Sequence, residues 1–284
     1  MRRALNIVRG LGAAAFGLVA YFYLTLPDVR PLTTVNPTTT AFMELRAHEA
    51  DATGRPIRRD HRWVRYSRIS QHLKRAVLVA EDSAFWDHEG IDLEEIRKSM
   101  EVNLREGRAV RGASTITQQL AKNLYLSPSR DPFRKLRELI IARRLEAALS
   151  KARIFEIYLN VVEWGDGVWG AEAAARRYFG IPASEVGPAQ AALLAGALVN
   201  PRLLSPARPT GRLVRRQRLI LARMGGVTPP SPTPVFSPEP TPLPTEPAVE
   251  ELPPSEATLP DIVEPSQHEE SVPPPPDEPG PEQY

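Results

Sequence analysis

The apolar and polar residues of this chain follow a helical period over most of its length. Apolar side chains recur three and four positions apart in eight segments, and few stretches of four or more residues alternate as strands do. The predicted helices span residues 71–82, 93–105, 114–126, 133–149, 153–162, 171–178, 188–199 and 211–224. We therefore expect a mainly α domain with at most a small β element near residues 42–66.

A long apolar run precedes these helices. Residues 11–26 carry no charge, and extension back to Ala4 gives a helix of about 34 Å, enough to cross a bilayer. Arg2, Arg3 and Arg9 come first, which predicts a cytoplasmic N-terminus and an exported remainder. A cleaved signal peptide is the alternative, although bulky residues stand before Pro27 where small ones are needed. We interpret residues 1–27 as a cytoplasmic start and a single transmembrane anchor.

The C-terminal segment has a different composition. Residues 228–284 hold 19 of the 30 prolines and twelve acidic residues, without Lys or Arg. Such a segment buries too little apolar surface to offset the entropy of ordering, so we expect a disordered, acidic, Pro-rich tail. A ligand for a groove in a partner protein is the alternative. The predicted domain is then residues 28–227.

Charge and cysteine content narrow the functional classes. Residues 1–227 hold 36 basic and 22 acidic residues, a net charge of +14, so an anionic partner such as a phosphate, a nucleic acid or a membrane surface is favoured. The chain has no cysteine, which excludes disulfides and thiolate sites.

The segment GASTITQQLAKNLYL, residues 112–126, combines an apolar stripe with an unusual polar face. On a helix beginning near Ser114, the side chains of Ser114, Gln118 and Lys122 share one side. Hydroxyl and amide groups with one lysine form a hydrogen-bonding face rather than the mixed charges of a surface helix. A solvated amphipathic helix is the alternative interpretation.

Two acidic positions are candidates for general acid or base chemistry. Glu81 and Asp82 end a predicted helix, where the helix dipole disfavours carboxylates, so a role other than stability is indicated. Glu138 shares a helix face with Arg134, and basic residues on both sides could hold a diphosphate while this acid assists a reaction. Solvated surface acids and a salt-bridged surface glutamate are the respective alternatives.

The remaining pattern is mainly structural. Residues 151–180 are predicted as core, with Glu156 and Asn160 structural and a tight turn between helices at the glycines 165, 167 and 170. Motifs of zinc proteases, P-loop enzymes and nucleophile-elbow hydrolases are absent from the sequence, and the histidines are not spaced as metal ligands. The arginines do not form a nucleic-acid-binding module.

Four motifs in this order, EDSAFWDHEGID, GASTITQQLAKNLYL, RKLRE and IFEIYLN, resemble the peptidoglycan glycosyltransferase family, glycosyltransferase family 51. NPTTTAFM, residues 36–43, is similar to its monofunctional, membrane-anchored branch. The resemblance implies a lysozyme-like, two-lobed helical fold. It also implies polymerisation of lipid II, in which the growing lipid-linked glycan chain is transferred onto lipid II and undecaprenyl diphosphate is released. The implied setting is a bacterial cytoplasmic membrane, with the catalytic domain on the periplasmic or extracellular side.

The resemblance also implies roles for individual residues. Glu81 is expected to be the general base, and Glu138 to assist departure of the diphosphate. Phosphates and sugars are expected at Lys122, Arg130, Arg134 and Lys135, and hydrogen bonds from Ser114, Thr115, Gln118 and Asn123, with Asp82 and His88 shaping the first motif.

The resemblance does not require a cofactor, and a divalent cation such as Mg²⁺ stays an option. Expected partners are lipid II, the nascent glycan strand, the membrane and proteins of cell-wall synthesis or division, without nucleic acid. A lysozyme-like hydrolase or lytic transglycosylase and a non-enzymatic membrane-anchored scaffold are the alternative functions.

Overall fold

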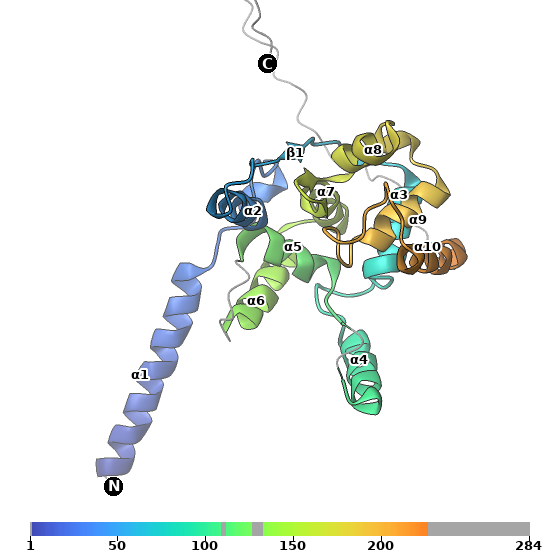
Figure 1. The fold of residues 1–284 in the computed structure, drawn as a ribbon. Coiled ribbons are helices and arrows are strands. Elements are labelled where there is room, and N and C mark those ends of the chain that lie inside the picture. The colour runs from blue at the N-terminus through green and yellow to red at the C-terminus, as the bar shows by residue number, and fades with distance from the viewer. Residues whose placement is uncertain (1, 109–111, 127–132, 227–284) are drawn as a thin grey trace, which may run out of the picture. The chain divides into compact units, whose positions relative to one another are not determined.

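The computed structural model describes residues 2–108, 112–126 and 133–226 (Figure 1). Its helices are α1 (Arg2–Thr25), α2 (Ala41–Ala52), α3 (Gln71–Glu81), α4 (Leu93–Glu106), α5 (Ile116–Tyr125), α6 (Phe133–Ala148), α7 (Lys151–Val161), α8 (Ala171–Phe179), α9 (Pro188–Ala197) and α10 (Gly211–Arg223). Short 3₁₀ turns connect several of them. The mainly α prediction is confirmed, whereas the predicted tail and Arg130 lie outside the described residues.

Helix ends follow capping chemistry that is written in the sequence. Side-chain oxygens cap the N-termini of six helices by accepting a backbone N–H, namely Thr40, Ser70, Asp92, Thr115, Ser150 and Thr210 for α2, α3, α4, α5, α7 and α10. Gly107 and Gly180 adopt left-handed conformations directly after α4 and α8, where a side chain would be strained. These caps explain why most predicted boundaries lie within two residues of the observed ones.

Two local expectations can be compared with the structure. The small β element expected near residues 42–66 is β1 (Asp60–His61), although the same segment begins with α2, a helix that was not predicted. The glycines at 165, 167 and 170 lie between α7 and α8 as expected, but the tight turn there belongs to a hairpin of β2 (Glu163–Gly165) and β3 (Val168–Trp169), which was not predicted. β3 pairs antiparallel with β2 and parallel with β1, which gives a three-stranded sheet in the order β1-β3-β2.

The core forms around α5 and α7. α5 packs against α6 and α7, while α3 packs against α9 and α10. Ile116, Leu120 and Leu124 of α5 are buried as predicted, but Gln118 and Asn123 are buried too. The predicted polar face is therefore not a solvent face, and Ser114 precedes the helix instead of sharing a side with Gln118.

α1 is long and apolar enough to cross a membrane over Leu5–Phe22, a finding that fits an anchor and a signal sequence alike. Most of its described apolar side chains are exposed, so the protein gives them little cover. Near its C-terminal end, the Phe22 ring packs edge-on against Phe133 of α6, with 6.3 Å between ring centroids. α6 is therefore in contact with the end of this helix.

Candidate active site

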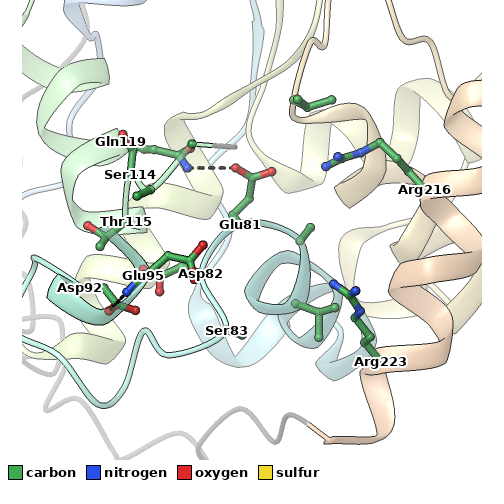
Figure 2. A pocket seen from close by; sticks show the side chains of 15 residues that line it. Glu81, Asp82, Ser83, Asp92, Glu95, Ser114, Thr115, Gln119, Arg216 and Arg223 are labelled. Carbon is green, nitrogen blue, oxygen red and sulfur yellow. Dashed lines mark hydrogen bonds between the residues drawn. The ribbon is translucent and has the colours of Figure 1, made fainter. Parts of the chain in front are cut away.

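A cavity of about 580 Å³ opens at the C-terminal end of α3 (Figure 2). It is bounded by the end of α3, the segment leading into α5, the start of α4 and one face of α10. Its polar lining consists of Glu81, Asp82, Ser83, Asp92, Glu95, Ser114, Thr115, Gln119, Arg216 and Arg223.

Glu81 is the last residue of α3, and its carboxylate lines the cavity (Figure 2). Its Oε2 accepts a hydrogen bond of 2.9 Å from Nε2 of Gln119 on α5. Burial raises the pKa of Glu81, although this hydrogen bond and the positive charges of Arg216 and Lys122 lower it. A raised pKa makes a carboxylate a stronger base, and a position beside a cavity lets it take a proton from a bound group, as a general base does.

The orientation of Gln119 is set from the core. The hydroxyl of Tyr158 on α7 donates a hydrogen bond of 2.9 Å to Oε1 of Gln119, which leaves the amide nitrogen directed at Glu81. Burial holds the pKa of Tyr158 well above its usual range, so the hydroxyl keeps its proton. The chain Tyr158–Gln119–Glu81 thus connects the carboxylate to the centre of the fold.

Asp82 joins the end of α3 to the start of α5. Its Oδ2 accepts a hydrogen bond of 2.9 Å from the backbone N–H of Ile116, and Nε2 of His88 lies 3.1 Å from both carboxylate oxygens. The Thr115 hydroxyl donates to the Gly90 carbonyl at 2.7 Å and tightens the same junction. Asp82 is buried, and these hydrogen bonds fix the residue that directly follows Glu81 to the start of α5.

Two arginines of α10 face the acidic side of the cavity. Arg216 and Arg223 lie seven residues apart and point into the cavity from the wall opposite Asp82 and Asp92 (Figure 2). Nε of Arg216 donates to the Gly196 carbonyl at 3.1 Å, which fixes this side chain near Glu81.

Glu138 lies in a separate, cationic cluster on α6. Its carboxylate is buried, with Nζ of Lys135 at 2.5 Å and Nη1 of Arg134 at 3.3 Å. Nζ of Lys135 also lies 3.4 Å from Oε1 of Gln118. The cluster does not line the Glu81 cavity.

Lys122 of α5 lies between these two acidic centres. Burial lowers its pKa, whereas the charges of Glu138 and Glu81 both act to raise it, so the ammonium group is within electrostatic range of each carboxylate. Its Nζ lies 5.7 Å from the ring centroid of Phe42 on α2. In the described residues it makes no ion pair, which leaves its charge available to an anion.

The structure therefore distributes the predicted residues over two places. Glu81, Asp82, Ser114 and Thr115 line the cavity, and His88 supports it through Asp82. Gln118, Lys122, Arg134, Lys135 and Glu138 gather on the α5–α6 side. Asn123 donates to the carbonyl of Gln119 within its own helix and does not line the cavity, and Arg130 is outside the described residues.

Several cavity residues were missed from the sequence. Gln119 was passed over for Gln118, because a helix assumed to begin at Ser114 suggested the wrong face. Arg216 and Arg223 sit in a helix with many arginines, and Asp92 and Glu95 belong to the first turn of α4, where acidic residues are common caps. The sequence carries no signal that separates these side chains from ordinary surface charges.

The fold also brings together three groups that could hold a divalent cation. The ligand atoms of Asp82, His88 and Asp92 lie within 4.8 Å of one another, although they are not spaced as a metal motif in the sequence. Asp82 and Asp92 already accept backbone hydrogen bonds from Ile116 and Glu95, so the arrangement is satisfied without an ion.

Glu156 and Asn160 have the structural roles predicted for them. Glu156 accepts hydrogen bonds from the Tyr66 backbone and from Arg153. The Asn160 side chain pairs with both the N–H and the carbonyl of Val64. Both residues fix the loop before α3 to α7.

Comparison with known proteins adds an independent finding. A family model described as Transglycosylase matches residues 49–225. A biosynthetic peptidoglycan transglycosylase of Aromatoleum aromaticum is 53% identical over 199 residues, which cover 69% of this chain and 86% of that protein. Proteins with the same description from Methylobacillus flagellatus and Laribacter hongkongensis are 49% and 47% identical, cover 76% and 78% of this chain, and are themselves covered to 94% and 97%.

Proposed function

Because this chain belongs to the transglycosylase family and is a glycosyltransferase of peptidoglycan synthesis, we propose that it polymerises lipid II. The growing lipid-linked glycan is the donor, the incoming lipid II is the acceptor, and undecaprenyl diphosphate leaves. The observation that carries this proposal is the separation of Glu81 in its cavity from the cationic Glu138 cluster, with Lys122 in electrostatic range of both carboxylates.

Glu81 acts as the base of this reaction. Its carboxylate takes the proton from the acceptor hydroxyl while the hydroxyl oxygen bonds to the anomeric carbon of the donor. The raised pKa of Glu81 makes its carboxylate a stronger base, and the hydrogen bond from Gln119 holds that carboxylate beside the cavity. The acceptor hydroxyl attacks one face of the anomeric carbon and the diphosphate leaves from the other, as in inverting glycosidases.

The cluster on α6 acts on the leaving group. The bond from the anomeric carbon to the diphosphate breaks with its electron pair going to the diphosphate, and Lys122, Arg134 and Lys135 stabilise the charge that develops there. The three positive charges outnumber the single negative charge of Glu138, and the Glu138 carboxylate itself orients Arg134 and Lys135. A diphosphate of low basicity needs this positive field more than it needs a strong acid.

A lipid-linked substrate also suits the position of α6. Phe133 contacts Phe22 near the end of α1, and Glu138 follows Phe133 by five residues, about 8 Å along the helix axis. With α1 as a single-pass anchor whose N-terminus is cytoplasmic, the diphosphate of a membrane-bound substrate would emerge near this cluster.

Polymerisation of labelled lipid II by the purified full chain tests the proposal. Wild type is compared with Glu81→Gln and Glu138→Gln, and with Glu185→Gln as a matched control, since Glu185 is exposed and does not line the cavity. We expect long glycan from wild type and the control, at least about 1000-fold slower synthesis in Glu81→Gln, and a smaller loss in Glu138→Gln. Shortening of pre-formed glycan without consumption of lipid II would instead identify a hydrolase, and full activity in Glu81→Gln would refute the base.

A further inference from the structure

A second pocket, separate from the Glu81 cavity, is lined by four arginines. Arg46, Arg55, Arg58 and Arg202 surround a hollow of about 320 Å³, together with the acidic residues Glu49 and Asp166. It has no lining residue in common with the Glu81 cavity. Cations outnumber carboxylates here even when Glu163, which pairs with Arg46, is included.

Two of these arginines are already paired. Arg46 bonds to Glu163 at 3.1 Å and to Glu49 at 3.0 Å, and Arg202 reaches the same Glu49 at 3.2 Å. Arg202 also approaches Asp166 at 4.0 Å. These ion pairs give the pocket a fixed wall that joins α2, the β2–β3 hairpin and the segment after α9.

The other two arginines, Arg55 and Arg58, have no acidic partner among the described residues. In the part of the chain that the structure describes, neither Arg55 nor Arg58 forms an ion pair, and Nε of Arg55 donates only to the Thr53 hydroxyl, at 2.9 Å. The backbone of Arg58 is nevertheless fixed. A Cβ at Gly167 would lie 2.6 Å from the Arg58 carbonyl oxygen, and the Asp60 N–H donates to the Gly167 carbonyl at 2.8 Å. Two arginines thus line the pocket without a carboxylate partner among the described residues.

One face of α2 connects this pocket to the proposed donor site. Phe42, Arg46 and Ala50 are four residues apart and share that face. The ring of Phe42 lies beneath Lys122, whereas Arg46 and Ala50 line the pocket. The distance along the helix from Phe42 to Ala50 is about 12 Å. A chain that leaves the Lys122 cluster along α2 would therefore meet the four arginines.

From this arrangement we propose that the arginine pocket binds the carboxylates of the peptides carried by the growing glycan strand. This inference rests on the proposed polymerase function. Arginine forks suit carboxylates because two parallel N–H groups can bind both oxygens. A strand held at Arg55 and Arg58 after each addition is retained for the next one, so the pocket raises the number of additions made before release.

The double variant Arg55→Ala/Arg58→Ala tests this in the full-length protein with lipid II, read as mean strand length. Both side chains are exposed, so the fold should survive, and circular dichroism checks it. Loss of two charge-assisted contacts should release the strand about tenfold faster and shorten it by up to the same factor. The control Arg212→Ala/Arg218→Ala removes the same charge from exposed positions of α10 outside the pocket and should leave strand length unchanged. Unchanged length in the Arg55/Arg58 variant would overturn the inference.

Lipid II whose peptide carboxylates are amidated identifies the ligand. Wild type should make short strands from it, and the double variant should shorten them no further, because both changes remove the same contact. Long strands from the amidated substrate would overturn the assignment of the carboxylate. If wild type makes no polymer from unmodified lipid II, that result would instead count against the proposed function. In that event, equal affinity of the Glu81→Gln protein for glycan strands with and without peptides would count against the pocket separately.

Discussion

The hydrogen bond from Gln119 to Glu81 can be removed with little change in volume. In Gln119→Leu the 2.9 Å hydrogen bond to the carboxylate is lost, and the hydroxyl of Tyr158 loses its acceptor. A hydrogen bond to a charged group contributes about 1.5–3 kcal/mol. The ionised fraction of Glu81 on the acidic side of its titration should therefore fall roughly 10- to 150-fold.

The sign of the effect on pH dependence follows from the same contact. Burial already raises the pKa of Glu81, and the hydrogen bond from Gln119 opposes this effect. Its removal raises the pKa further, so the acidic limb of kcat/KM against pH should move to more alkaline pH. The assay is lipid II polymerisation at a series of pH values.

Two further variants make the result specific. Tyr158→Phe keeps the Gln119 amide but removes the hydroxyl that orients it. The acidic limb of kcat/KM should therefore also move to more alkaline pH, but by a smaller amount than in Gln119→Leu. Gln71→Leu changes an exposed glutamine at the other end of α3 and should not move it. If Gln119→Leu lowers the rate equally at every pH, Gln119 is only a packing residue and the reasoning is refuted.

Three other predictions concern single positions. Glu81→Gln should increase the free energy of unfolding at neutral pH by on the order of 1 kcal/mol, because a raised pKa means that the ionised carboxylate destabilises the fold. Thermal unfolding should show a higher melting temperature at neutral pH. This gain should disappear below about pH 4, where the wild-type carboxylate is protonated in both the folded and the unfolded state. Equal gains at both pH values would contradict this. In wild type, KM for lipid II should rise at alkaline pH, because burial lowers the pKa of Lys122 and the side chain loses its charge there. Lys122→Arg should abolish this rise, since an arginine stays charged. A rise that persists in the variant would show that another group titrates. Gly170→Ala should cost about 3 kcal/mol or more in urea unfolding, because φ is +84° there and a Cβ would lie 2.5 Å from the carbonyl oxygen of Asn160; wild-type stability would refute this account.

The helices could be predicted because their signals are local. Ser70, Asp92 and Ser150 cap helices by bonding to backbone groups two or three residues on, and apolar periodicity carries through the segments that follow. A small β element was expected near β1, but the bounds of the short strands and the β2–β3 hairpin could not be predicted, since two or three residues cannot show alternation. α2 was missed because its apolar side chains form only a weak stripe.

The site was predictable in its chemistry but less so in its geometry. Glu81 stood out through its position against the helix dipole, a feature that is local in sequence. Its partners Gln119 and Arg216 come from helices that meet α3 only in three dimensions. The predicted helix began at Ser114, two residues before α5, and the face defined by Ser114 includes Gln118 but not Gln119, since neighbouring residues on a helix point about 100° apart.

The chain of hydrogen bonds from Tyr158 to Glu81 also bears on when the enzyme becomes active during biogenesis. Glu81 and Gln119 belong to α3 and α5, but the hydroxyl that orients Gln119 arrives with α7, almost forty residues later in the sequence. In the proposed topology the N-terminus stays in the cytoplasm and the residues after α1 cross the membrane in sequence order, so Glu81 and the α6 cluster would be outside before α7 supplies the hydroxyl that orients Gln119. In the proposed mechanism, full activity requires α7 to be docked, so a partly folded or truncated chain would bind lipid-linked substrate without polymerising it efficiently.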